Sequence, residues 1–595
     1  MKLQASIRST IVLAVALFVC LGQAQANAQG ADGAAGASPS CTTSGDTMLR
    51  AFKDELDRTV SSLKLEGHPT PYFAAYTATE YHGFSISGSF GAVDTRFDGN
   101  SRAASVDVRV GDKKFDGSGN QADFGFMSGR SNFSLDDNYD AIRRQLWLIT
   151  DSAYKRAIES LESKKATLQH KKIEDLPDSM SPAKPAVVIV PMTEPNSDQK
   201  TWERTVRDVS SVFKSYPDVI DSQITFNSRA NTRWFANTEG SMNREPDKTC
   251  TLTMNAQAQA SDGMNVIDFE LLGAQDDKQL PAAAELSDTA KRLAERVSAL
   301  AKAPIAEEDY RGPILFEKQA AAEFFSQTLA PNLVNPTENL FGGGGHFSMF
   351  SGGLKEKIGR RILPTSVTVV DDPQKKEFNG LPLMGNYLVD DEGVKGERVV
   401  LVQNGILKTL CSSRTPSKYI KETNGHCQRG SASTSQIFVT TSDPTPLTAM
   451  KQKLLQMGKE DGLKYVLIAR KVEDASTRFA THMAVNIFAG MSMGDQLSLS
   501  PPTQLYKVNV EDGSEELVRG AKFEHLTTRV WRDIVACGDD TQPFLVYNRG
   551  DCNSLVTPSI LVQEIDVTRA SRETDKPMVL KNPYFRQNTS ENIKK

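Results

Sequence analysis

The sequence lacks an excess of charge of either sign. It carries 69 Lys and Arg residues against 74 Asp and Glu, a formal net charge of −5, and no basic block stands out. Because a surface that follows phosphates normally shows a basic excess, nucleic acid is not expected as a partner. With 39% hydrophobic residues over 595 positions, the chain has ample material for sizeable cores and for two to four domains.

A second long apolar run is also missing. The one such run, residues 11–22, follows the positive residues Lys2 and Arg8 and precedes the small-x-small sequence at 24–26. This order is typical of a secretory signal peptide and not of a membrane span. We therefore expect residues 1–26 to be a Sec-type signal peptide, and the mature chain to be periplasmic or extracellular without a membrane span.

Closely spaced C-x-x-C pairs are absent, which argues against a structural zinc site of that kind. Of the seven cysteines, Cys20 lies in the signal peptide and lacks the small preceding residue that a lipoprotein site carries. The other six are Cys41, Cys250, Cys411, Cys427, Cys537 and Cys552. An even number in an oxidising compartment permits disulfides, and Cys411–Cys427 and Cys537–Cys552 are the most plausible pairs, although the connectivity stays open.

Several catalytic and ligand-binding signatures are missing as well. There is no G-x-S-x-G of a serine hydrolase, and no G-x-x-x-x-G-K-[ST] accompanies the glycine run at 342–345. The acidic turns at 371–373 and 390–393 lack the spacing of a calcium loop. The seven histidines form no His-x-His or His-x-x-x-His pattern, so a histidine metal site would need residues that folding brings together.

The pattern of apolar residues predicts an α+β protein, with N-terminal mixed α/β segments followed by a mainly antiparallel β C-terminal domain. The expected parts after the signal peptide are a disordered leader at 27–45, an N-terminal α/β segment at 46–170, a central α/β segment at 186–302, a β-rich domain at 312–567 and a polar tail at 568–595.

Local spacing places the elements within these parts. Helices are predicted at about 46–65, 137–169, 201–214 and 285–302, and N-terminal strands at 72–81, 83–93, 104–111, 222–240 and 251–260. The first helix should bury Leu49, Phe52, Leu56, Val60 and Leu63. The clearest hairpin lies at 398–410, where Asn404-Gly405 supplies the positive φ angles of a type I′ turn.

Four segments of the C-terminal half follow one another in order, at 312–333, 357–373, 386–414 and 424–430. Together they resemble the C-terminal domain of the TldD/TldE (PmbA) family of metallopeptidase-related proteins, and the phrase DDEGV before the hairpin is the most specific part. The resemblance implies a two-subunit assembly. TldD-type members carry H-E-x-x-x-H on a helix, bind a metal ion and hydrolyse peptides, whereas TldE-type members lack the ligands. Peptides are expected in extended form, held by main-chain bonding.

On this motif the two histidine positions fall on Ala322 and Gln327, and the glutamate position falls on Glu323. A methyl group cannot bind zinc, and a carboxamide is a weak ligand beside imidazole. Without a metal to acidify water, Glu323 would be a catalytic remnant. A purely structural explanation is a core helix that buries a stripe at 321, 325 and 329 and leaves Glu323 solvated or capping.

Two residues are weak candidates for a rebuilt metal site. His346 follows the glycine run and lies nineteen residues from Gln327, although a solvated loop histidine is the simpler interpretation. Cys537 lies near the region where TldD-type proteins supply a further cysteine ligand. A disulfide from Cys537 to Cys552 would remove even this ligand.

Three functions are therefore compatible with the sequence. The first is an exported, non-catalytic TldE-like pseudoenzyme that binds peptides and forms a heterodimer with a metal-bearing TldD-type subunit, or a homo-oligomer, in proteolysis of small or unfolded peptides. This hypothesis expects no cofactor in the chain, and zinc or iron in the partner. The second is an active metallopeptidase with substituted ligands. The third is a stand-alone peptide-binding β protein.

Overall fold

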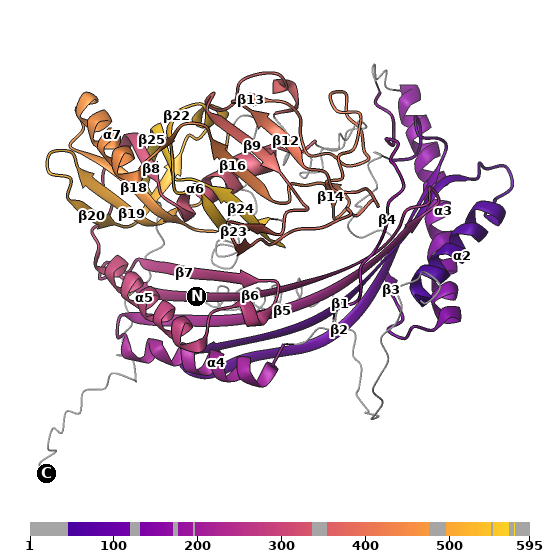
Figure 1. The fold of residues 1–595 in the computed structure, drawn as a ribbon, viewed down its shortest axis with the longest axis horizontal. Coiled ribbons are helices and arrows are strands. Elements are labelled where there is room, and N and C mark those ends of the chain that lie inside the picture. Colours follow the sequence, from indigo (N-terminus) through magenta and orange to yellow (C-terminus); the bar gives the residue numbers. More distant parts are fainter. Residues whose placement is uncertain are drawn as a thin grey trace, which may run out of the picture.

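The computed structural model describes residues 46–118, 131–170, 176–193, 197–335, 354–474, 496–548, 551–570 and 576. The expected signal peptide, leader and most of the polar tail lie outside these ranges. A long, curved sheet forms one layer, and the β-rich C-terminal half lies along its concave side (Figure 1). No helix in the described ranges is long and apolar enough to cross a membrane.

The curved sheet has seven strands in the order β3-β2-β1-β5-β6-β4, with β7 paired to β6. Its strands are β1 (Pro71–Ser89), β2 (Ala92–Val110), β3 (Ser131–Asn132), β4 (Val187–Ile189), β5 (Val219–Asn237), β6 (Met242–Gln259) and β7 (Asn265–Ala274). β1 and β5 pair antiparallel, from Ala75 opposite Asn237 to Gly88 opposite Ile224. The N-terminal and central α/β segments therefore share one sheet.

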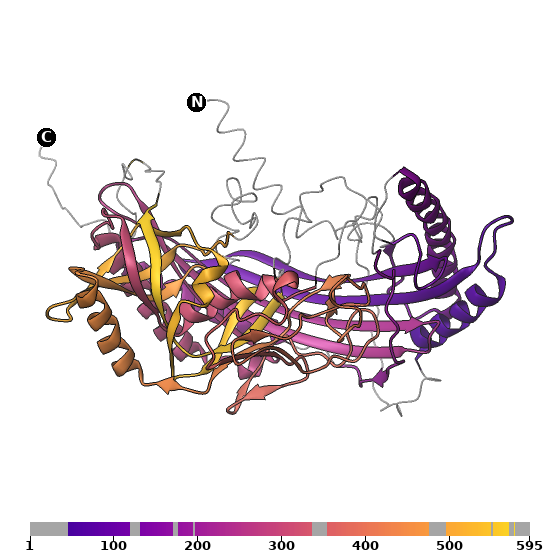
Figure 2. The same cartoon turned by 90° about the horizontal axis from the view of Figure 1, so that it is seen from above.

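Two pairs of helices cover the two ends of this sheet (Figure 2). They are α2 (Thr47–Ser62), α3 (Tyr139–His170), α4 (Gln199–Ser211) and α5 (Ala283–Lys302). α2 and α3 bury apolar stripes against one end, around Tyr76 and Trp234. α4 and α5 do the same at the other end, around Phe226, whose ring stacks on that of Trp202 at 3.8 Å between centroids.

The C-terminal half contains two further sheets. The six-stranded sheet has the order β13-β12-β9-β16-β24-β23, and the eight-stranded sheet has the order β17-β22-β25-β8-β18-β19-β20, with β21 paired to β25. The six strands are β9 (Val367–Asp371), β12 (Val399–Gln403), β13 (Ile406–Leu407), β16 (Ile437–Thr441), β23 (Gln542–Asn548) and β24 (Asp551–Thr557). The eight are β8 (Tyr310–Phe316), β17 (Pro444–Thr445), β18 (Tyr465–Val472), β19 (Pro502–Asn509), β20 (Glu515–Val518), β21 (Ala521–Glu524), β22 (Ile534–Gly538) and β25 (Ile560–Arg569).

Shorter elements connect these sheets. Two small hairpins pair β10 (Glu377–Phe378) with β11 (Leu381–Pro382), and β14 (Cys427–Gln428) with β15 (Ser431–Ala432). Single 3-10 turns lie at Val212–Ser215, Asp277–Gln279, Ala330–Asn332, Lys355–Lys357 and Thr528–Trp531. Most strand pairs are antiparallel, so the predicted α+β class with a mainly antiparallel C-terminal domain is confirmed.

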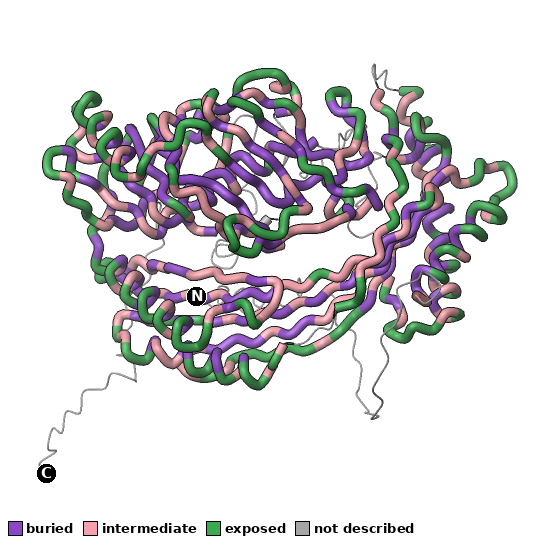
Figure 3. The backbone as a smooth tube through the Cα atoms, viewed as in Figure 1, coloured by how far each residue is buried: buried purple, intermediate pink, exposed green. Residues whose placement is uncertain are grey.

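The helix that carries the peptidase-like motif lies between these two sheets. α6 (Gln319–Phe324) continues into a π-helical turn, Phe325–Leu329, and touches β8 and β18 on one side and β23 and β24 on the other. Both sheets contribute buried residues to the same hydrophobic core, and many segments of their strands are buried, drawn purple in Figure 3. A second helix, α7 (Leu447–Glu460), packs Met450 and Leu454 on the opposite face of the eight-stranded sheet.

Charged pairs join the curved sheet to the C-terminal half. Arg233 on β5 binds Asp391, and Lys471 on β18 binds Asp268 on β7 at 3.2 Å. The guanidinium of Arg414, which is 1% exposed, pairs with Glu239 at 2.6 Å. These buried charges are all paired, as burial of a charge requires.

The predicted helices and the 398–410 hairpin are present, with φ of 49° at Asn404 and 76° at Gly405. One expected core residue is wrong, because Val60 is 61% exposed at the outer end of α2. Two elements were not predicted from the sequence: α7, and the part of β2 at 94–103, whose polar side chains are mostly exposed. Main-chain pairing to β1, and not side-chain burial, makes that part a strand.

Candidate functional site

Gln327, at the second histidine position of the motif, is fully engaged in hydrogen bonds. Its Nε2 donates to Glu323 Oε2 and to the carbonyl oxygen of Glu473, both at 2.8 Å. Its Oε1 accepts the main-chain N–H of Ser500, also at 2.8 Å. The amide therefore links the π-helical turn to the chain after β18 and to the chain before β19.

Glu323, the predicted catalytic remnant, is 1% exposed, so the expectation of a solvated or capping side chain is wrong. Its Oε1 has no hydrogen-bond partner among the described residues. Burial, with the nearby negative charge of Asp474, raises the pKa of this carboxyl well above its usual range. This shift favours the protonated carboxyl, a state that cannot accept a proton as a general base.

Ala322 fills the first histidine position and is buried, like its neighbours Ala320 and Ala321. The predicted stripe at 321, 325 and 329 is buried in the core as expected. Since Ala322 offers a methyl group and Gln327 an amide that is already bonded, these positions do not fit the metal ion that the TldD-type motif implies.

The two candidates for replacement ligands do not complete this site. His346 lies outside the described residues. Cys537 lies on β22, opposite Pro444 and Ile560, and burial raises the pKa of its thiol to about 12. In the part of the chain that the structure describes, Cys537 belongs to no group of three or more metal-ligating side chains.

The two predicted disulfides are not formed in the structure, where all five described cysteines are free and buried. Cys537 and Cys552 lie on β22 and β24, which belong to different sheets. Cys411 contacts Asp371, whereas the Cys427 main chain binds Asp390. Each sulfur thus has its own apolar or acidic surroundings.

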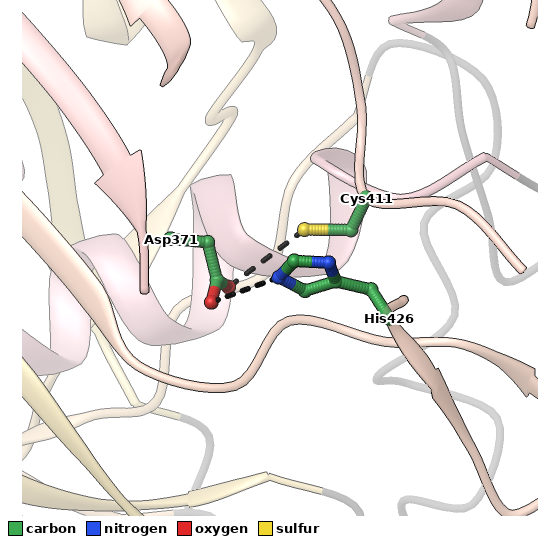
Figure 4. A group of neighbouring side chains, drawn as sticks. All are labelled: Asp371, Cys411 and His426. Atoms are coloured by element: carbon green, nitrogen blue, oxygen red, sulfur yellow. Dashed lines mark hydrogen bonds and ion pairs between the residues drawn. The ribbon is translucent and has the colours of Figure 1, made fainter. Parts of the chain in front are cut away.

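Folding brings together a different group, Asp371, Cys411 and His426, which the sequence analysis did not single out (Figure 4). Asp371 ends β9, Cys411 follows β13, and His426 precedes β14. All three side chains are buried, and their ligand atoms lie within 4.8 Å of one another. His426 Nε2 lies 3.3 Å from Asp371 Oδ1, and Cys411 Sγ lies 3.7 Å from Oδ2.

Neighbouring groups hold each member of this cluster in place. Asp371 accepts the main-chain N–H of Ser435 at 2.8 Å, the Ser435 hydroxyl, and the N–H of Gln436 at 3.3 Å. His426 Nδ1 lies 3.0 Å from the carbonyl oxygen of Asn424. Burial lowers the pKa of His426, but the negative charge of Asp371, together with the hydrogen bonds to Asp371 and to the Asn424 carbonyl oxygen, raises it overall. Burial raises the pKa of the Cys411 thiol well above its usual range.

A short sequence motif would not have revealed this cluster. Cys411 lies 40 residues after Asp371, and His426 lies 55 residues after it. The segments that hold them contributed to the family resemblance, but no spacing pattern marked these residues as ligands. Their proximity depends on the pairing of β9 with β12 and β16, which only the fold provides.

A small hollow connects the two regions. It is lined by Ser326 and Ala330 of the helix region, by residues of β23 and β24, and by Ser435 with its neighbours at the start of β16. It leaves about 10 Å³ for the centre of a water molecule, which is room for about one water. Ser435 is the link, because it lines the hollow and also donates to Asp371.

Comparison with known proteins shows what the C-terminal half is similar to. Residues 309–569 match the PmbA/TldA metallopeptidase C-terminal domain. A metalloprotease of Methanocaldococcus jannaschii is 44% identical over 61 residues, which are 10% of this chain and 12% of that protein. One from Methanothermobacter thermautotrophicus is 24% identical over 205 residues, which are 34% and 40%. The chain thus matches less than half the length of these curated relatives.

Solved structures extend the likeness in fold over most of the chain. TldE from Thermococcus kodakarensis has a TM-score of 0.51 at 12% identity, covering 87% of this chain and 100% of that one. A protein of Thermotoga maritima, described as a putative modulator of a DNA gyrase, has a TM-score of 0.54 at 17% identity with the same coverage. At such identities the likeness concerns the fold alone. Residues 309–569 thus match the C-terminal domain of the PmbA/TldA metallopeptidases, and most of the chain shares its fold with the solved structure of TldE.

Proposed function

We propose that the protein is a non-catalytic, TldE-like subunit that binds peptides and acts with a metal-bearing TldD-type partner in the hydrolysis of small or unfolded peptides. The partner would supply the zinc or iron. In line with the sequence analysis, we propose that the chain is exported by its N-terminal signal peptide and works in the periplasm or outside the cell.

The hydrogen bonding of Gln327 is the observation that carries this proposal. In an H-E-x-x-x-H site this position would offer an imidazole nitrogen with a free lone pair to the metal. Here the Gln327 amide joins Glu323, Glu473 and Ser500 with three bonds of 2.8 Å. To bind a metal through Oε1, the side chain would have to release the Ser500 N–H in a largely buried place, which is unfavourable.

The state of Glu323 supports the same conclusion. Its carboxyl is buried, its pKa is raised, and the amide of Gln327 donates to one of its oxygens. The motif positions have thus become a hydrogen-bonded structural unit between two sheets. Peptide binding does not depend on these residues, because an extended peptide can pair its main chain with a strand edge.

The decisive experiment compares peptide cleavage by three samples. These are the purified mature chain, an H-E-x-x-x-H subunit of the same family from the same source, and their mixture, each incubated with an unstructured peptide. We expect co-purification of the two subunits, no cleavage by this chain alone, and cleavage by the mixture that a chelator abolishes. Inactivating the partner by replacing its motif glutamate with Gln is the control for the origin of the activity.

Other results would favour the other two functions. Chelator-sensitive cleavage by this chain alone, lost in Cys537→Ser or His346→Ala, would overturn the proposal and identify an active metallopeptidase with substituted ligands. Peptide binding without cleavage in any mixture, and without association with the second subunit, would identify a stand-alone binding protein.

A further inference from the structure

We propose that Asp371, Cys411 and His426 form a zinc-binding site, separate from the motif helix. The three side chains offer an oxygen, a sulfur and a nitrogen ligand, a combination that suits Zn²⁺. They come from three chain segments and converge in the interior, where one carboxylate oxygen of Asp371 faces His426 and the other faces Cys411 (Figure 4). This inference goes beyond the proposed function, which concerns only the altered peptidase positions.

The distances suit a tetrahedral ion. With Zn–N and Zn–O bonds of about 2.1 Å and a Zn–S bond of about 2.3 Å, the tetrahedral angle separates N from O by about 3.4 Å and S from O by about 3.6 Å. His426 Nε2 lies 3.3 Å from Asp371 Oδ1 and Cys411 Sγ lies 3.7 Å from Oδ2, so each carboxylate oxygen has about the required separation from one of the other two ligand atoms. As a hydrogen bond to a carboxylate, the contact from His426 is long, since such bonds are usually about 2.7–2.9 Å from nitrogen.

The surroundings of His426 point in the same direction. Its Nδ1 faces the carbonyl oxygen of Asn424, which can only accept, so Nδ1 carries a hydrogen. Its Nε2 faces the Asp371 carboxylate, which also only accepts. Nε2 must then either carry a second proton or present its lone pair to a cation. A metal-ligating histidine usually donates its other ring N–H to a carbonyl or carboxylate oxygen, as Nδ1 of His426 does to Asn424.

Charge balance allows the exchange of protons for the metal. Without zinc, a carboxylate, an imidazolium and a thiol sum to zero. With zinc, the ion (2+), the carboxylate (1−), the thiolate (1−) and a neutral imidazole also sum to zero. Binding of one Zn²⁺ would therefore release about two protons, one from Nε2 and one from Sγ.

A small hollow lies close to the cluster. A site with three protein ligands leaves a fourth position for water. Ser435 binds Asp371 and also lines this hollow, which has room for about one water molecule.

The test uses the full mature chain, stripped with a chelator and then titrated with zinc chloride. We expect about one zinc per chain after desalting, measured by mass spectrometry, and release of about two protons, measured by calorimetry in buffers of different ionisation enthalpy. Cobalt in place of zinc should give a thiolate-to-metal charge-transfer band. Cys411→Ser should lose this band and weaken zinc binding at least tenfold.

A matched control is available nearby. Cys427 is also a buried free cysteine, but it lies outside the cluster, so Cys427→Ser should keep the band and the zinc. Zinc binding unchanged in both Cys411→Ser and His426→Gln would refute the site, as would the absence of a thiolate band in the cobalt-loaded wild type, a result that does not depend on the folding of any variant. Because Ala322 and Gln327 are untouched in all these proteins, failure here leaves the proposed function standing.

Discussion

Replacing Gln327 with Leu tests whether the former metal-ligand position now has a structural role. The substitution keeps the approximate size of the side chain and removes three hydrogen bonds of 2.8 Å. It leaves the Ser500 N–H, the Glu473 carbonyl and Glu323 Oε2 without this partner. A buried group left unsatisfied costs about 1–3 kcal/mol. Because Gln327 is half-buried and water can partly replace it, we expect a total loss of about 2–4 kcal/mol.

Thermal unfolding followed by tryptophan fluorescence would measure this loss. Trp531 is a suitable reporter, since it is buried beside the π-helical turn and donates to Thr328 Oγ1 at 3.0 Å. For a domain of this size the loss corresponds to a decrease in Tm of roughly 4–16 °C. The control is Gln456→Leu on the exposed face of α7, which should change stability by less than about 0.5 kcal/mol. A Gln327→Leu protein as stable as this control would refute the structural role.

Three further substitutions test other parts of the structure. Glu323 has a folded-state pKa raised above its unfolded value, so protonation of its carboxyl favours the folded protein. This contribution to stability is complete below about pH 4.5 and is lost as the pH rises toward the folded-state pKa. Glu323→Gln should abolish this pH dependence and stabilise the protein at neutral pH, as urea unfolding at pH 4 and pH 7 would show. Gly405→Ala should lower the free energy of unfolding by about 2 kcal/mol or more, because φ is 76° and the new Cβ would lie 2.3 Å from the Leu363 carbonyl oxygen. Its control, Asn404→Gly, should be almost neutral in the same unfolding assay. Arg414→Ala should cost about 1–3 kcal/mol, because it removes the ion pair with Glu239, which keeps Lys113, and the hydrogen bonds to the Ser181 carbonyl oxygen. Calorimetry should then resolve separate unfolding of the curved sheet and the C-terminal half, whereas a single unchanged transition would contradict a coupling role for this pair.

The sequence was a good guide where local chemistry decides the structure. The amphipathic spacing of α5 and the Asn404-Gly405 turn each depend on residues within one element, and both were predicted correctly. The polar part of β2 was not, because its pairing with β1 is a property of the sheet and not of its own side chains. Val60 shows the same limit, since helical spacing does not show where the partner surface ends.

The candidate sites divide in the same way. The altered motif could be recognised in the sequence because Ala322, Glu323 and Gln327 lie within six residues. The burial and the raised pKa of Glu323 could not be predicted, because they depend on two sheets and on Asp474. The cluster of Asp371, Cys411 and His426 could not be predicted from the sequence, since strands far apart in sequence bring its members together. Disulfide pairs inferred from short separations failed for a related reason, because β22 and β24 diverge into different sheets.

The pairing of β1 with β5 has a consequence for synthesis of the chain. β1 ends at Ser89, but its partner is complete only at Asn237, roughly 150 residues later. At a synthesis rate of about 5–20 residues per second, β1 therefore has one unpaired edge for roughly 7–30 s. During that time it is exposed to other chains, so a binding protein or slow release from a membrane channel would improve the yield of native protein. A fragment that ends in the 171–185 linker would keep that edge open permanently, and it should aggregate where the longer chain folds.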